Sequence, residues 1–278
     1  MLTRIQVLNL LEQEREYILS QAQLPTSDPP KWSIPDLRWY LKMAENWALV
    51  ALWELARNQS PGRLLDIGAF YCLASGAACR IGWKAVGVDY APIPSYSGLA
   101  SRGAETALCN ISVDSLPFDS SSFDAIFFLE VLEHLPYSPA HPFREMHRVL
   151  KPGGRLYLTT PNAASLSRVR LLLLGKNHEP SVDAFVDEDD PFSYKGMTFF
   201  KSQREARLWT VEELRALLPV WGFRLADYYF YSSVVYDPDF PSRVRRLSMA
   251  AKFWMHPLLC RIRLLGGGGM FVVAERPL

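Results

Sequence analysis

Residues 64–90 read LLDIGAFYCLASGAACRIGWKAVGVDY, and this stretch decides the fold. It opens with apolar residues that end at Asp66, and Gly68 then permits a tight turn. The small residues that follow are typical of a closely packed helix, and a second apolar strand is expected from Lys84 to Asp89. A strand, a helix and a second strand in this order form a unit whose two strands lie parallel. The stretch therefore predicts a parallel sheet with helical crossovers.

The sequence on both sides continues the alternation. Five further strands are expected over residues 104–110, 124–129, 155–160, 223–231 and 270–275. Two amphipathic helices are expected before the first strand, over residues 2–24 and 36–58. Thr210, with Glu213 three residues later, predicts the start of another helix. This order indicates an α/β, Rossmann-like fold with a mainly parallel seven-stranded sheet and helices on both faces.

The order of expected helices and strands divides the chain into an N-terminal extension and a main domain. Residues 1–60 are interpreted as an N-terminal helical extension, and residues 61–278 as the main domain. Within the main domain the periodicity fails over residues 163–207, which predicts an irregular lid inserted as a cap. Basic and apolar residues are interleaved over residues 241–265. Within this segment, residues 243–263 are interpreted either as a surface helix with snorkelling arginines or as a peripheral membrane contact.

Composition narrows the class of partner. The 278 residues are 49% hydrophobic and carry a net charge of +1, which is typical of a globular protein and gives no general attraction to nucleic acid. The four cysteines and five histidines lack the spacing of a metal site, so no metal is expected. The N-terminus lacks the pattern of a signal peptide, and no segment has about twenty uninterrupted apolar residues. These observations favour a cytoplasmic protein with a small-molecule partner.

Two residues of the first unit point to nucleoside binding. Gly68 would let the backbone approach a ligand closely, and Asp89, at the tip of the second strand, could accept hydrogen bonds from both ribose hydroxyls. This spacing fits a nicotinamide dinucleotide and S-adenosylmethionine (SAM) equally well.

A second run separates these alternatives. Residues 109–162 contain Leu116-Pro117-Phe118, Ser122-Phe123-Asp124, the segment EVLEHL at 130–135 and the segment RVLKPGG at 148–154. The chain over residues 64–162 closely resembles the class I SAM-dependent methyltransferases, and residues 204–223 resemble them more loosely. The resemblance implies SAM as cofactor and S-adenosylhomocysteine as product.

The resemblance also implies roles for individual residues. The loop after the first strand would shape the methionine end of the pocket, Asp89 would hold the ribose, and Asn110 with Ile111 would lie at the adenine. Glu130 would face the junction of cofactor and acceptor. The residues implied to contact the cofactor are Asp66, Gly68, Ala69, Phe70, Asp89, Tyr90, Asn110, Ile111 and Glu130.

Three positions depart from the family pattern. Phe70 and Cys72 stand where the first loop usually has its second and third glycines, and Asn110 stands where many relatives have aspartate. SAM has no pyrophosphate, so the missing glycines count more against a dinucleotide than against SAM. An asparagine can still present a carbonyl oxygen to the adenine amino group.

The resulting hypothesis is methyl transfer from SAM to the oxygen or nitrogen of a small-molecule, sugar or lipid-linked acceptor. Glu130 and His134 are the candidate catalytic residues, and His178 is a further candidate base. Two alternatives stay open. One is a non-catalytic binding or scaffold protein with a degenerate cofactor loop, and the other is a nicotinamide oxidoreductase. The sequence leaves the acceptor and the oligomeric state open.

Overall fold

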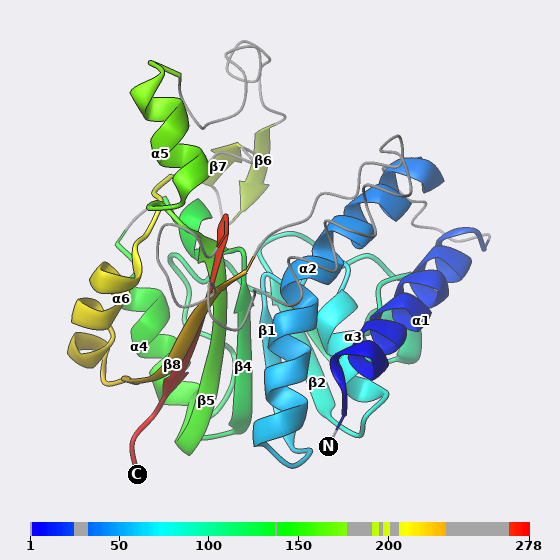
Figure 1. The fold of residues 1–278 in the computed structure, drawn as a ribbon. Coiled ribbons are helices and arrows are strands. Elements are labelled where there is room, and N and C mark those ends of the chain that lie inside the picture. Colours follow the sequence, from blue (N-terminus) through cyan, green and yellow to red (C-terminus); the bar gives the residue numbers. More distant parts are fainter. Residues whose placement is uncertain are drawn as a thin grey trace.

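The computed structural model describes residues 2–24, 33–136, 138–176, 191–194, 197–200, 206–231 and 267–278. Their main feature is a seven-stranded sheet with the strand order β3-β2-β1-β4-β5-β9-β8 (Figure 1). The strands are β1 Arg63–Ile67, β2 Lys84–Asp89, β3 Thr106–Leu108, β4 Phe123–Leu129, β5 Leu150–Pro161, β8 Arg224–Tyr231 and β9 Gly269–Glu275. Strands β1 to β5 pair in parallel, and β9 is antiparallel to both of its neighbours. The predicted α/β fold is therefore confirmed.

The strand order creates a natural place for a ligand. The chain builds outward from β1 through β2 to β3, and then returns to the other side of β1 with β4 and β5. Successive connections therefore leave β1 and β4 toward opposite faces of the sheet. Between two such strands a crevice opens at their carboxyl ends, which is where open α/β sheets bind ligands.

Helices cover both faces of the sheet. On one face lie α1 (Arg4–Ala22), α2 (Ile34–Asn58) and α3 (Leu73–Cys79), and α4 (Ala140–Val149) and α6 (Val211–Leu217) lie on the other (Figure 1). Each layer encloses its own hydrophobic core, because alternate residues of every strand point to opposite faces. Short 3₁₀ turns, η1 (Ala100–Arg102), η2 (Leu132–His134) and η4 (Pro219–Trp221), complete the connections.

The start of α2 differs slightly from the expectation at Asp36. Ser33 is the N-cap, and its side chain accepts a hydrogen bond from the Asp36 amide at 3.3 Å. Pro35 occupies the first turn, where a missing amide proton costs nothing. The helix therefore begins at Ile34, two residues before the predicted start.

A buried carboxylate attaches α1 to the main domain. Glu14 is fully buried and pairs with Arg80 and Arg102, with its two oxygens 2.6 to 2.7 Å from the guanidinium nitrogens. It fits only because Gly76 and Gly98 have no side chain, since a Cβ on either residue would lie within 2.6 Å of the Glu14 Oε1. Removing one residue of this cluster would leave the charge of another buried and unpaired, which is strongly destabilising. This cluster thus fixes the helical extension on the sheet.

The segment expected to be an irregular lid contains regular structure. Helix α5 spans Leu166–Leu173, and β6 (Pro191–Tyr194) pairs antiparallel with β7 (Met197–Phe200). The hydrophobic pattern missed α5 because none of its residues is buried. His178 and the basic segment 241–265 lie outside the described residues.

Candidate functional site

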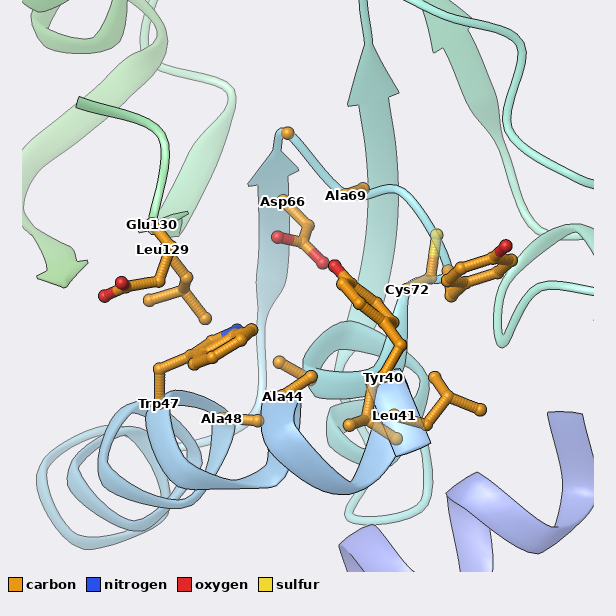
Figure 2. A pocket seen from close by; sticks show the side chains of 14 residues that line it. Tyr40, Leu41, Ala44, Trp47, Ala48, Asp66, Ala69, Cys72, Leu129 and Glu130 are labelled. Atoms are coloured by element: carbon orange, nitrogen blue, oxygen red, sulfur yellow. The ribbon is translucent and has the colours of Figure 1, made fainter. Parts of the chain in front are cut away.

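A cavity of about 90 Å³ opens at the carboxyl ends of β1 and β4, and α2 packs along one side of it (Figure 2). The sheet contributes carboxylates to its wall, at Asp66 and Glu130, and α2 contributes the aromatic side chains of Tyr40 and Trp47. The complete lining is Tyr40, Leu41, Ala44, Trp47, Ala48, Asp66, Gly68, Ala69, Tyr71, Cys72, Leu73, Ala74, Leu129 and Glu130. This is the crevice that the strand order predicts, closed on one side by the N-terminal extension.

Gly68 forms the turn that borders the cavity. Its φ angle is +73°, and a Cβ at this position would lie 2.4 Å from Cγ2 of Val131. Its amide and that of Ala69 both donate to the Val88 carbonyl, at 2.8 and 3.1 Å. Both the backbone conformation and the close approach therefore require glycine here.

Phe70 and Cys72, the two departures from the glycine pattern, keep the backbone conformation that glycine would favour. Their φ angles are +43° and +57°, in the left-handed region. A side chain held there costs on the order of 1 kcal/mol or more. Packing offsets part of this cost, because the Phe70 ring lies 4.2 Å from that of Tyr71 and 5.4 Å from that of Tyr40, between ring centroids. The loop thus keeps its expected path without the glycines.

Asp89 holds this loop from the tip of β2. One carboxylate oxygen accepts from the Phe70 amide at 3.0 Å, and the other accepts from the Ala91 amide at 3.1 Å. Burial raises the pKa of this carboxyl, and the backbone amides partly counteract that rise. Asp89 therefore joins the two loops that follow β1 and β2. It does not line the cavity, and its neighbour Tyr90 is exposed.

Asp66 is a buried carboxyl group of the cavity wall with a strongly raised pKa. Burial raises its pKa to about 7, and repulsion from Asp89 adds to the rise, whereas a 2.5 Å hydrogen bond from the Ser75 hydroxyl opposes it. The Tyr40 hydroxyl also has a raised pKa, because it is buried and faces Asp89, Asp66 and Glu130. The cavity therefore contains carboxyl groups, at Asp66 and Glu130, whose ionised form a positively charged ligand would favour.

Glu130 lies on the opposite wall, directly after β4, in a left-handed conformation with a φ of +53°. Its amide donates to the carbonyl and the hydroxyl of Thr159, both at 3.0 Å. Its carboxylate accepts from the Tyr231 hydroxyl at 2.9 Å. Gly269 makes room for that ring, because a Cβ there would lie 2.4 Å from the ring of Tyr231. Thr159 of β5 thus fixes the Glu130 backbone, and Tyr231 of β8, with room made by Gly269 of β9, fixes its carboxylate.

The remaining predicted residues, Asn110, Ile111 and His134, are not among the residues that line the cavity. Asn110 and Ile111 are buried beyond the end of β3, and the Asn110 side-chain oxygen accepts from the Ser112 amide at 3.1 Å. His134 does not line the cavity, and its Nε2 lies 3.8 Å from Oε1 of Glu133. Glu133 itself is buried and accepts from the Thr160 hydroxyl at 2.9 Å, as expected of a structural residue.

Sequence reasoning did not assign Tyr40, Trp47 or Tyr231 to the site. A signal existed for the first two, because Tyr40, Ala44, Trp47 and Ala48 recur at the spacing of one helix face. The Tyr231 contact joins residues 101 positions apart in the chain, and no local pattern reports it. Among the described residues, no cluster of three histidine, cysteine or acidic side chains could hold a metal ion.

Comparison with known proteins finds a family that matches the central part of the chain. Residues 65–158 match the family model described as a methyltransferase domain. The chain is thus similar to methyltransferases over this part of its length, and solved SAM-dependent methyltransferases share its fold.

The similar curated proteins include two bacterial examples. A ubiquinone biosynthesis O-methyltransferase of Xanthomonas oryzae pv. oryzae is 34% identical over 130 residues, which is 42% of this chain and 54% of that protein. The protein of the same name from Nitrosococcus oceani is 36% identical over 104 residues, 36% of this chain and 44% of that one. The chain thus spans about half the length of the curated relatives it matches.

Solved structures agree in fold. A SAM-dependent methyltransferase from Mesorhizobium loti is 17% identical and has a TM-score of 0.52, covering 84% of this chain and 100% of its own. The 1,6-didemethyltoxoflavin-N1-methyltransferase of Burkholderia thailandensis, solved with bound 1,6-didemethyltoxoflavin and S-adenosylhomocysteine, is 16% identical with a TM-score of 0.51. That match covers 85% of this chain and 79% of the other.

The residues of this cavity fit SAM, the cofactor of the class. SAM carries positive charge on its ammonium and its sulfur, and the cavity offers buried or half-buried carboxylates and aromatic rings. The cavity is nevertheless smaller than the roughly 300 Å³ at which small-molecule sites begin. We therefore expect α2 side chains such as Tyr40 to move when a ligand of this size binds.

Proposed function

We propose that this protein transfers a methyl group from SAM to a hydroxyl oxygen of a small, ring-containing acceptor. The observation that carries the proposal is the pair of carboxylates, Asp66 and Glu130, facing one cavity at the switch point of a methyltransferase domain. The names of the curated relatives, which are O-methyltransferases, support oxygen over nitrogen as the methylated atom. Sugar and lipid-linked alcohols remain within the proposed acceptor class.

Asp66 is the proposed binding residue for the cationic end of the cofactor. When bound, SAM supplies an activated methyl group on a positively charged sulfur. Because the pKa of Asp66 is about 7, a nearby cation would draw this carboxyl into its ionised form. Asp89 contributes indirectly. Its carboxylate accepts a hydrogen bond from the Phe70 amide and thereby fixes the loop that follows β1.

Tyr40 and Trp47 are proposed to cover the reactants. Both belong to α2, and both point into the cavity from the side opposite the sheet (Figure 2). Their rings exclude water and offer flat surfaces against which an acceptor ring can stack. Methyl transfer depends mainly on holding two reactants in line, which can contribute roughly 7 to 11 kcal/mol to the barrier reduction.

Glu130 is the proposed general base. Its carboxylate lines the cavity and can accept the proton of an acceptor hydroxyl. Tyr231 is a positioning residue, because its hydroxyl donates to the Glu130 carboxylate. Burial and the nearby Glu130 charge raise the Tyr231 pKa, so this hydroxyl keeps its proton and remains a donor. His134 is the weaker candidate because it lies outside the cavity lining.

The test is a transfer assay with SAM labelled in its methyl group, offered with pools of small phenols, glycans and lipid extracts. We expect label in one acceptor fraction, a loss of about 10² to 10⁴ in rate for Glu130→Gln, and near wild-type rate for the control His134→Gln. SAM binding without transfer to any pool would favour the non-catalytic alternative. Loss of activity in His134→Gln alone would move the base to that residue.

A further inference from the structure

Helix α5 exposes an unusual number of leucines. None of its residues is buried, and Leu166, Leu172 and Leu173 are 51%, 59% and 83% exposed. Leu174, which follows the helix, is 60% exposed. Single exposed leucines are common on soluble proteins, but apolar side chains gathered on one short helix indicate a binding surface.

The same segment is positively charged. Residues 162–176 contain Arg168, Arg170 and Lys176 and no acidic residue. Arg170 and Lys176 are exposed, and no acidic side chain among the described residues pairs with either. Exposed leucines interleaved with cations complement a surface that is apolar inside and anionic outside, which describes the headgroup region of a membrane.

Helix α5 and the cavity lie at the same edge of the sheet. The helix follows directly after β5 and stands above the carboxyl edge of the sheet, and its C-terminal end points away from the strands (Figure 1). The cavity lies at that same edge, after β1 and β4. A flat surface touching Leu172, Leu173 and Leu174 would therefore face the side of the molecule that holds the cavity.

We propose that α5 and its C-terminal tip, residues 166–176, bind the surface of anionic lipid membranes. The leucine side chains enter the interfacial layer, and Arg170 and Lys176 contact lipid phosphates. Among the described residues no helix is long and apolar enough to cross a bilayer, and contact at the surface requires none. The inference does not depend on methyl transfer. If the proposed function also holds, it identifies the acceptor class as lipid-dissolved alcohols.

The experiment is co-sedimentation of the full chain with vesicles of phosphatidylcholine mixed with phosphatidylglycerol, and with vesicles of phosphatidylcholine alone. We expect binding to the anionic vesicles that weakens in high salt, and little binding to the neutral ones. Leu173→Glu should weaken binding about tenfold or more, because it removes an inserted side chain and adds a repelled charge. Arg170→Glu should weaken it about 25-fold, since each unit charge near such a surface corresponds to about a fivefold change.

Matched controls come from the opposite edge of the sheet. Val220, in η4 just before β8, is 75% exposed, and Lys84 is the exposed first residue of β2. Val220→Glu and Lys84→Glu should bind vesicles as the wild type does. Circular dichroism and SAM binding verify that every variant is folded.

Three results would overturn the proposal. The first is no binding of the wild type to anionic vesicles. The second is equal loss in the α5 variants and their controls. The third is a wild-type dimer, seen by sedimentation velocity and abolished by Leu173→Glu, without vesicle binding, which would make α5 a contact between copies of the chain. Methyl transfer without vesicle binding separates failure of this inference from failure of the proposed function.

Discussion

Replacing Asp66 with asparagine should stabilise the protein and impair its function together. The folded protein holds the proton of Asp66 up to a pH of about 7, whereas the unfolded chain releases it near 3.8. Folding stability is therefore lost as pH rises between these two values and is flat above them. At about 1.4 kcal/mol per unit, the full cost at pH 8 is at most about 4 kcal/mol, and about 1.5 kcal/mol of it is already present at pH 5.

Asparagine removes this dependence while its side-chain oxygen can still accept the hydrogen bond from Ser75. Urea denaturation from pH 5 to pH 8 should show Asp66→Asn more stable than the wild type, by a margin that grows by about 1 to 3 kcal/mol over that range. The same variant should bind SAM more weakly, because the cationic end loses its carboxylate. Asp119→Asn, at an exposed position, is the control and should change neither quantity. A stability difference that does not vary with pH would refute the electrostatic account of Asp66.

Three further predictions concern a hydrogen bond, a backbone angle and a buried ion-pair cluster. Tyr231→Phe should lower kcat about tenfold with little change in KM, because Glu130 loses its donor, whereas Tyr229→Phe should leave kcat unchanged, since the buried Tyr229 hydroxyl has no partner among the described residues. At position 70, glycine should give a more stable protein than alanine by about 1 kcal/mol in thermal unfolding, the reverse of the usual order, because the φ of +43° strains any side chain; alanine equal to or better than glycine would contradict this. Glu14→Gln should cost about 2 kcal/mol in chemical denaturation, and the exposed control Glu105→Gln less than about 0.5 kcal/mol; equal losses would remove the case for the buried cluster.

The fold was predictable because its determinants are local. Apolar runs, the Gly68 turn and the Thr210 and Glu213 capping box each act within a few residues, and the structure contains the corresponding elements. Some strands begin or end at other residues than predicted, because pairing with a neighbouring strand determines where they begin and end. β5, for example, begins at Leu150 rather than Arg155, because Leu150 pairs with Phe123 across the sheet.

The site was predictable only in part. Four of the predicted residues line the cavity: Asp66, Gly68, Ala69 and Glu130. They could be predicted because they lie at strand ends, and the sequence pattern shows where those strands end. The wall formed by Tyr40 and Trp47 depends on where α2 crosses the sheet, which is a tertiary property. The missing glycines at positions 70 and 72 suggested a degenerate loop, yet ring packing and the Asp89 carboxylate keep the loop in its glycine-like conformation.

The central claim is that this cavity binds a cationic adenosyl ligand, and calorimetric titration of the full chain with SAM and with NAD tests it most directly. Both ligands contain adenosine, but only SAM carries the ammonium and sulfonium that the Asp66 side of the cavity favours. We predict saturable one-to-one binding of SAM, competed by S-adenosylhomocysteine, and no binding of NAD at the same concentrations. Absence of SAM binding by the folded protein, or equal binding of NAD, would contradict the account.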